Sequence, residues 1–327
     1  MSGNPMQGFD PKWTSPEHYI IGITKEIWED RNIATLHHYY AREMPVRTPG
    51  GLTLGNQGVI AATMATLSEF PDRTLLAEDV IWSEDPDGGF LSSHRILTTA
   101  THSREGVFGP ATGKRLTYRV VADCAARANV IHDEWLIRDQ AAIVRQMGWE
   151  PKAFAADQIA REGGPERCPR PFSPAIDVQG GYRATGNTHE AGQRYAAILQ
   201  AIMGADMAVI PREYDRAVQL EHPGGATGHS HADADRFWMG LRAAFPSAHF
   251  EIYHRIGRAD PAMPHRAAIR WSLTGKHDGW GSFGPPTGAD IHVMGICHAE
   301  FGPWGLRREF VLIDETAIWK QIVLKTG

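Results

Sequence analysis

Apolar residues recur along the chain with two periodicities, one typical of helices and one typical of strands, and the same order of the two occurs twice. In each half, apolar residues three and four positions apart come first and predict helices. Four stretches of alternating apolar and polar residues follow, and turns rather than helices join them, which favours antiparallel strands. A last helical stretch ends each half. The pattern predicts an α+β fold built twice, with N-terminal helices packed on a curved, mostly antiparallel sheet.

The first half begins after a loose arm at residues 1–14. Its helices are predicted at about 15–30, 33–40, 58–70 and 140–147, and its strands at about 74–83, 93–101, 116–126 and 130–137. Residues 44–54 are predicted to be extended around a Pro-Gly-Gly turn. The helices of the second half are predicted at about 190–203, then to 214, at 233–245 and at 315–324, with strands at about 248–258, 266–276, 290–300 and 306–312.

One turn motif occurs in both halves. Phe-Gly-Pro-Ala-Thr-Gly at residues 108–113 returns as Phe-Gly-Pro-Pro-Thr-Gly at residues 283–288, which is 283 − 108 = 175 positions later. Other residues recur at the same offset, namely Arg95 and Arg270, His102 and His277, Glu134 and Glu309, and Asp139 and Asp314. Chance similarity rarely keeps one register through so many turns, so the sequence predicts an internal duplication.

A stretch rich in Pro and Gly separates the halves. Gly163-Gly164-Pro165 and Gly180-Gly181 disfavour long helices or strands there and leave room for one short helix near residues 154–161. The sequence therefore predicts a first domain at residues 1–150, a linker at 151–187 and a second domain at 188–327.

Composition narrows the classes of partner and compartment. The net charge of −5 and the pI near 6.3 disfavour nucleic acid, because phosphate binding needs a basic face. No apolar run approaches the roughly 20 residues that span a bilayer, and the N-terminus lacks the apolar stretch of a secretory signal. The three Cys form no Cys-x-x-Cys pair, so neither a disulfide framework nor a zinc knuckle is indicated. We expect a cytoplasmic protein.

The repeated motifs resemble those of SnoaL-like domains, the polyketide-cyclase and ester-cyclase branch of the nuclear transport factor 2 superfamily. The resemblance rests on residues 106–113, Glu134-Trp135, Asp139 and the triplet at 146–148 in the first half. In the second half it rests on residues 281–288, Glu309-Phe310 and Asp314, while Gln321-Ile322-Val323 replaces the triplet. It implies two tandem cone-shaped, cystatin-like α+β barrels, each with a cavity between sheet and helices. It also implies chemistry without a cofactor, in which a carboxylate removes an acidic C–H proton, a His assists and an intramolecular aldol closure follows.

The chain departs from this resemblance at the reacting residues. The position of the family's catalytic Asp falls on Leu136 and Val311, and that of the assisting His falls on Ala122 and Cys297. A slip of one residue in strand register would exchange the two faces of the sheet and bring Asp123 and His298 to the pockets instead.

Glu134 and Glu309 are the predicted acid–base residues, because strand alternation places both on the pocket face. A carboxyl group in an apolar cone has its pKa raised by loss of solvent, which suits proton transfer near neutral pH. His94 is the candidate acid or substrate anchor of the first pocket. The alternative is structural: each Glu hydrogen-bonded across the barrel mouth, and His94 satisfied in the core.

Aromatic and imidazole side chains on or near the pocket faces are the candidate substrate contacts, namely Tyr118, His102, Trp271, His277 and Tyr253. For His102 and His277, at a strand end beside the repeated turn, a structural hydrogen bond is the favoured interpretation. For Trp271 and Tyr253, a place in the pocket wall or core is favoured. Asp139 and Asp314 each precede a helix and are predicted to be N-caps.

A cluster at His222, His229 and His231 is the one candidate for metal binding. His-x-His can direct two imidazoles to one ion, but no spaced ligand scaffold supports it, and solvated loop histidines are the favoured interpretation. We therefore expect no metal and no cofactor.

Three functions remain open. The first is a cofactor-independent acid–base enzyme of the cyclase, lyase or isomerase kind that acts on a small carbonyl-containing molecule. The second is a non-catalytic module in which both cones hold a ligand or one cone only scaffolds the other. The third is a metal-dependent hydrolase. The expected partner is a small molecule rather than nucleic acid or a membrane, and the repeats predict a pseudo-dimer within one chain, with further pairing into a homodimer as an open alternative.

Overall fold

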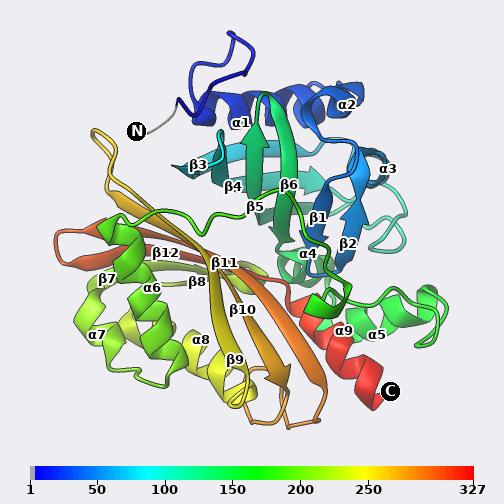
Figure 1. Cartoon of the computed structure of the whole chain (residues 1–327). Helices are drawn as coiled ribbons and strands as arrows, with labels where there is room; N and C mark the ends of the chain where they lie inside the picture. The colour runs from blue at the N-terminus through cyan, green and yellow to red at the C-terminus, as the bar shows by residue number, and fades with distance from the viewer. Residues whose placement is uncertain (1–3) are drawn as a thin grey trace. The chain divides into compact units, whose positions relative to one another are not determined.

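The structure, a computed structural model, describes residues 4–327. Its contacts divide the chain into two compact units (Figure 1). The first unit runs to Arg138 and includes residues 142–148 and 172–186. The second comprises residues 139–141, 149–171 and 187–327. The duplication predicted from the sequence thus corresponds to two structural units.

The first unit contains short helices and one six-stranded sheet. Its helical elements are α1 (Pro16–Thr24), a π-helical turn η1 (Lys25–Glu29), η2 (Ile33–Thr35), α2 (Leu36–Tyr39) and α3 (Gly55–Glu69), and α4 (Gln140–Met147) follows the last strand. Its strands are β1 (Pro45–Thr48), β2 (Gly51–Leu54), β3 (Thr74–Glu84), β4 (Phe90–Thr101), β5 (Arg115–Arg127) and β6 (Val130–Arg138). The strand order is β2-β1-β6-β5-β4-β3, antiparallel throughout except that β1 runs parallel to β6.

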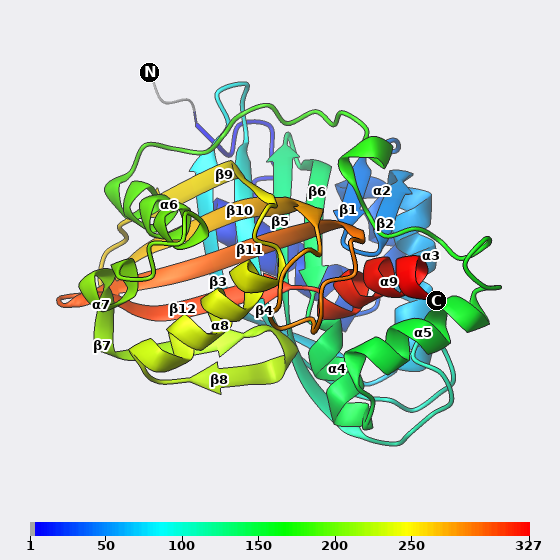
Figure 2. The same ribbon diagram turned by 90° about the horizontal axis from the view of Figure 1, so that it is seen from below.

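The second unit repeats this topology (Figure 2). Its helical elements are α5 (Pro151–Arg161), α6 (Glu190–Met203), α7 (Val209–Glu213), η4 (Pro223–Gly225), α8 (His231–Ala244) and α9 (Glu315–Thr326). Its strands are β7 (Tyr214–His222), β8 (Ala226–Gly228), β9 (His249–Arg258), β10 (His265–Lys276), β11 (Asp290–Gly302) and β12 (Gly305–Ile313). The order is β8-β7-β12-β11-β10-β9, and Figure 2 shows α6 and α8 across one face of this sheet. Both units are therefore α+β domains with mixed sheets.

The first part of the segment between the repeats is built into the second unit. Residues 151–161 form α5, in place of the short helix predicted near residues 154–161. The helix begins with Pro151, and proline is favoured in the first turn of a helix. The side chain of Ile159 packs with those of Cys168 and Val323, and Lys320 forms an ion pair with Glu162. These contacts pack this stretch against α9 of the second unit.

The second part of that segment packs on the first unit. The backbone N–H of Tyr182 donates to Asp133, 2.9 Å away, and the buried Arg47 forms ion pairs with Asp133 and Asp177 at 2.6 and 2.5 Å. A buried charge is costly unless it is paired. The stretch therefore supplies partners for Arg47, which a free linker would not.

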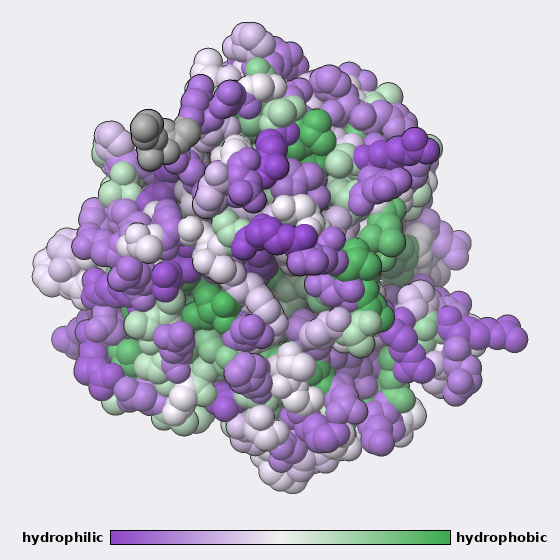
Figure 3. Space-filling view, in the orientation of Figure 1, coloured by the Kyte–Doolittle hydropathy of each residue, from purple (hydrophilic) through white to green (hydrophobic). Residues whose placement is uncertain are grey.

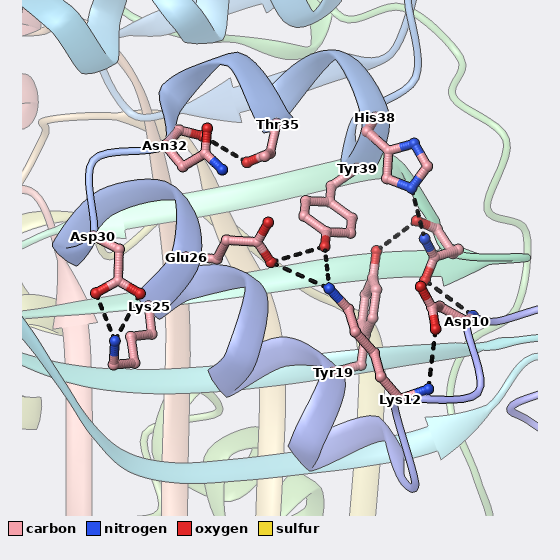
Figure 4. Close-up of polar contacts among 11 residues, drawn as sticks. Asp10, Lys12, Tyr19, Lys25, Glu26, Asp30, Asn32, Thr35, His38 and Tyr39 are labelled. Atoms are coloured by element: carbon pink, nitrogen blue, oxygen red, sulfur yellow. Dashed lines mark hydrogen bonds and ion pairs between the residues drawn. The ribbon is translucent and has the colours of Figure 1, made fainter.

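The predicted loose arm is ordered over residues 4–14. Lys12 donates from Nζ to the Tyr39 hydroxyl at 3.1 Å and lies 3.4 Å from Glu26. Figure 4 shows these three side chains pointing toward one another. The Trp13 ring packs over Gly22 of α1, where a Cβ atom would lie 2.2 Å from the ring. The arm therefore holds α1 and α2 in place above the sheet.

The surface is mainly hydrophilic on the face that Figure 3 shows, with hydrophobic side chains in small separate patches. Among the helices of residues 4–327, none is both long enough and apolar enough to cross a membrane.

Candidate active site in the first repeat

The first unit has a cavity of about 190 Å³ between its N-terminal helices and the inner face of its sheet. Most of its wall is apolar, with side chains from helices and strands that include Ile20, Ile23, Trp28, Val59, Leu75, Ile96, Val120, Ala122, Ile131 and Leu136. The titratable groups on the wall are Tyr40, Arg73, His94, Cys124, Glu134 and Arg138. A mostly apolar cavity with a few polar groups is typical of a small-molecule site.

The strand register decides which residues reach this cavity. His94 on β4 lies opposite Ala122 on β5, and Ala122 lies opposite Leu136 on β6. Glu134 lies opposite Cys124, one step along the same face, and all five side chains line the cavity. The predicted inner face is therefore present in the structure, and Leu136 and Ala122 stand where the resemblance places Asp and His.

The one-residue slip considered for this sheet does not occur. Asp123 pairs with Trp135, so both stand on the other face of the sheet, and neither lines the cavity. The irregularity in the β5–β6 pairing lies between Ala125 and Ala126, beyond the rows of Glu134 and Leu136. Glu134 is thus the one carboxyl group among the residues that line the cavity.

Glu134 is buried with one oxygen free. Its side chain is 5% exposed and is hydrogen-bonded to the Tyr40 hydroxyl. Its Oε2 has no hydrogen-bond partner among the described residues. Burial raises the pKa of Glu134 to about 7, opposed only in part by the Tyr40 hydrogen bond. A carboxyl group in this state can accept a proton near neutral pH.

His94 is buried and neutral. Burial, and then the positive charge of Arg95, lowers the pKa of His94 to about 3. Its Nε2 has no hydrogen-bond partner among the described residues. A neutral imidazole can donate a hydrogen bond when Nε2 carries the proton or accept one when it does not. His94 therefore offers one polar contact to a molecule in the cavity.

Arg73 and Arg138 also line the cavity, and neither was predicted from the sequence. Strand alternation could have identified Arg138, because it lies four positions after Glu134 on the same strand and therefore on the same face. Arg73 lies just before β3, outside any periodic stretch, so only the folded chain brings it to the cavity.

Glu309, the counterpart of Glu134, has a different environment. Its Oε1 accepts hydrogen bonds from the hydroxyls of Tyr195 at 2.9 Å and Tyr214 at 2.7 Å. Its Oε2 accepts from Trp238 Nε1 at 3.3 Å and lies 3.6 Å from His222 Nε2. The side chain is fully buried. The structure thus surrounds Glu309 with donors, which corresponds to the structural alternative considered for this residue.

Trp271 occupies the interior of the second cone. Its ring is fully buried in the core that also holds Trp238, and its Nε1 donates to Cys297 Sγ at 2.9 Å. A Cβ atom on Gly295 would lie 2.2 Å from the ring, so the glycine makes room for it. The first repeat has Ile96 and Val120 at the two corresponding positions. A large ring in one repeat thus fills space that smaller side chains border in the other.

The other predicted contact residues lie away from the cavity wall. His102 Nδ1 accepts from the backbone N–H of Thr112 at 3.2 Å, and its Nε2 lies 3.1 Å from Glu69, whose carboxylate also holds the repeated turn through Phe108 N. His277 Nδ1 lies 3.0 Å from the Thr287 hydroxyl. Both therefore occupy turn positions, as the favoured interpretation expects.

The two tyrosines differ from each other in burial. Tyr118 is buried on the inner face of β5, next to Arg73, but does not line the cavity. Tyr253 is 39% exposed, and its hydroxyl lies 3.0 Å from the Ser272 hydroxyl. The strand position of Tyr253 thus directs its side chain away from the core of its unit.

The three candidate metal ligands are directed to different partners. His222 stacks on Phe237 with ring centroids 4.1 Å apart, His231 Nε2 lies 3.1 Å from the backbone oxygen of Tyr214, and His229 is exposed before α8. Within residues 4–327, no three His, Cys, Asp or Glu side chains are grouped so that they could hold a metal ion. Asp314 is an N-cap, accepting from Thr316 N at 2.9 Å.

Glu134→Gln is expected to stabilise the protein at about pH 8 and to have little effect below about pH 4.5. The folded-state pKa of about 7 exceeds the ordinary value of 4.5, so the folded chain holds this proton more tightly than the unfolded chain. The destabilisation by Glu134 is therefore absent below about pH 4.5, grows as pH rises from 4.5 to 7, and levels off above about pH 7 at no more than about 3 kcal/mol. Urea unfolding of both proteins across this range measures the difference, and a difference that does not change with pH would contradict the assignment.

Both repeats match models of known protein families. Residues 19–147 match the family model described as SnoaL-like polyketide cyclase, and residues 193–306 match the model described as SnoaL-like domain. No curated protein sequence matches the chain significantly.

Solved structures also resemble parts of the chain. Wild-type IdmH, a putative polyketide cyclase from Streptomyces antibioticus, is 23% identical over 41% of this chain and 99% of its own, with a TM-score of 0.36. A putative polyketide cyclase from Acidithiobacillus ferrooxidans is 23% identical over 41% of this chain and 96% of its own, with a TM-score of 0.37. AclR, a putative hydroxylase from Streptomyces galilaeus, is 17% identical over 41% of this chain and 99% of its own, with a TM-score of 0.36. With a family match on each repeat and the same six-stranded topology in both, the chain is a tandem of two SnoaL-like domains.

Proposed function

We propose that the first repeat is a cofactor-independent acid–base catalyst that enolises a small carbonyl compound. The observation that carries this proposal is the buried carboxyl group of Glu134, a residue that lines a mostly apolar cavity and has one oxygen without a hydrogen-bond partner. Loss of solvent brings its pKa to about 7, where a base is both ionised in part and strong enough to remove a proton. The reaction belongs to the cyclase, lyase or isomerase kind.

The proposed step moves one proton and one electron pair. The Glu134 carboxylate takes a proton from a carbon next to a carbonyl group, and the C–H electron pair moves onto the carbonyl oxygen to give an enolate. The enolate carbon then attacks a second carbonyl of the same molecule and closes a ring, or takes a proton back at a different carbon. Glu134 returns the proton to the alkoxide or the carbon, so that atoms and charge balance within one molecule.

His94 is the proposed partner for the enolate oxygen. Glu134 and His94 stand on β6 and β4, two strands apart and one row apart, which separates their Cα atoms by roughly 12 Å in a flat sheet. The ligand thus lies between the two side chains. Because its pKa of about 3 keeps the imidazole neutral, His94 would donate a hydrogen bond from Nε2–H without giving up a proton.

The cavity volume limits the substrate. A cavity of about 150 Å³ is large enough for benzene, and this cavity is about 190 Å³. We therefore expect a molecule with a single ring, or an open chain of similar size. The second repeat serves, in this proposal, as a scaffold, because Trp271 and the hydrogen-bonded Glu309 occupy the interior of its cone.

The rate of proton removal is expected to rise with pH through about 7 and then level off, because only the ionised form of Glu134 is a base. No second ionisation of His94 is expected in the neutral range, since the pKa of that side chain lies at about 3. The measurement is exchange of the α-protons of a ring ketone for deuterium, followed by proton NMR at several pH values. A rate that falls as pH rises through 7 would contradict Glu134 as the base.

A further inference from the structure

The cavity of the first repeat holds two guanidinium groups without a carboxylate partner. Arg73 and Arg138 both line it, and neither forms an ion pair with any residue of the described chain. The Nε atoms of both are sealed from solvent and have no hydrogen-bond partner among residues 4–327. The uncharged hydroxyl of Tyr118 lies beside Arg73. The site therefore contains positive charge that the protein leaves unbalanced.

The two arginines also repel each other. Burial lowers the pKa of Arg73 to about 10; the nearby Tyr118 opposes this effect in part, and the positive charge of Arg138 adds a smaller lowering. Arg73 therefore stays protonated at neutral pH. Like charges close together in a poorly solvated place are unfavourable unless an anion joins them. An anionic group of a ligand would remove this penalty.

Glu134 is not that anion. It lies four residues before Arg138 on the same strand, which corresponds to roughly 13 Å between Cα atoms. The pKa of Glu134 is raised, whereas a guanidinium in contact with it would hold the pKa down. Base and cations thus occupy different places along the cavity wall.

The second repeat supports a role for the arginines in binding. At the offset of 175 positions, Arg73 corresponds to Ala248 and Arg138 to Ile313, both buried. The fold therefore forms without either cation. The arginine pair occurs in the repeat with the cavity, and apolar side chains replace it in the repeat whose interior is filled by Trp271.

We propose that the ligand of the first repeat is an organic carboxylate, whose carboxylate group is held by Arg73 and Arg138 while its carbonyl-bearing part lies toward Glu134. A guanidinium matches a carboxylate with two parallel hydrogen bonds, and the roughly single-ring volume leaves space for such an acid. The arginines neutralise the ligand's charge, so that it can enter a cavity that already contains an ionisable base. The role of Glu134 toward the ligand rests on the proposed function, whereas the binding of the carboxylate does not.

The test compares one acid with its neutral form. The probe is cyclohexanone with a carboxylate on the ring carbon two positions from the carbonyl, and the control is its methyl ester. Isothermal titration calorimetry with the full chain is expected to give at least tenfold tighter binding of the acid than of the ester. Equal affinities, no binding of either compound, or binding of inorganic phosphate as tight as that of the acid would each overturn the proposal.

Variants of the two arginines test whether they cause the preference for the acid over the ester. Arg138→Met and Arg73→Met are each expected to weaken binding of the acid about tenfold and to leave binding of the ester unchanged. Arg104→Met, at an exposed position of the same unit, is the matched control and is expected to change neither affinity. An acid preference that survives in both cavity variants would overturn the assignment. The comparison of acid and ester in the parent protein needs no variant, so it tests the binding of the carboxylate even where a variant does not fold.

The same compounds separate this inference from the proposed function. If the acid binds through the arginines, in the parent and in Glu134→Gln, but its α-protons do not exchange, then the carboxylate site stands and the catalytic proposal fails. If the ester's protons exchange through Glu134 with no preference for the acid, then the catalytic proposal stands and the carboxylate site fails.

Discussion

Glu134→Gln is expected to lower the rate of α-proton exchange by about 10²- to 10⁴-fold at a pH above 7, because that range is typical of a positioned general base. The amide keeps the size of the side chain but cannot take the proton. The cavity, His94 and both arginines stay in place, so binding of the ring ketone is expected to change little. The loss should therefore appear in kcat rather than in KM.

The chain provides its own control for this experiment. Glu309→Gln is the same substitution at the corresponding position of the second repeat, and it is expected to leave the exchange rate of the folded protein unchanged. Both variants are compared at a temperature at which circular dichroism shows them folded. Equal losses in the two variants, or full activity in Glu134→Gln, would remove Glu134 as the base.

Glu309→Ala is expected to lower the free energy of unfolding by about 3–5 kcal/mol, because it removes the acceptor of a buried network. The hydroxyls of Tyr195 and Tyr214 and the indole N–H of Trp238 all donate to this carboxyl group. Without it, these buried donors have no acceptor in the core of the second unit. Urea unfolding at neutral pH measures the loss.

Glu134→Ala is the matched control for stability. Its carboxyl group has one hydrogen-bonding neighbour, the Tyr40 hydroxyl, and it borders a cavity that already exists. We expect no loss of stability comparable to that of Glu309→Ala, since little packing and one hydrogen bond are lost and the cost of ionising a buried carboxyl group at neutral pH is removed. If the two alanine variants lose similar stability, the contrast between an unsatisfied Glu134 and a satisfied Glu309 is wrong.

Much of the fold could be predicted because its information is local and repeated. The alternation in residues 93–101 and 116–126 identifies the inner face, and the repeated turn identifies the register that brings Glu134 beside Leu136. Two copies of one pattern also correct each other, since an error in one half would break the offset of 175. The fold class and the face of both glutamates could thus be predicted from the sequence.

The difference between the two cones could not be predicted in the same way. It depends on whether the ring at position 271 turns inward over Gly295, and on donors that arrive from separate elements, Tyr195 from α6 and Trp238 from α8. Strand alternation places both glutamates on an inner face, but it does not indicate which side chains contact each carboxyl group there. The identical glutamates therefore gave identical hypotheses for two different environments.

The structure of the segment at residues 151–187 was harder to predict from the sequence for a related reason. Its Pro and Gly residues indicate the absence of long regular elements, but they do not indicate a lack of contacts. Its attachment depends on long-range pairs such as Arg47 with Asp177, 130 positions apart, which leave no local pattern. The buried charge of Arg47 on β1 thus holds in place the stretch around Asp177, which composition alone describes as a linker.

The ionisation of Glu134 tests the central claim most directly, because it needs no knowledge of the substrate. Carbon-13 NMR of protein labelled at the glutamate side-chain carboxyl carbons follows each carboxyl group through a pH titration, and Glu134→Gln assigns the resonance that disappears. We predict one carboxyl group that titrates near pH 7 and is missing from that variant. If the resonance lost in Glu134→Gln instead titrates near the ordinary value of 4.5, the proposed base of the first repeat is wrong.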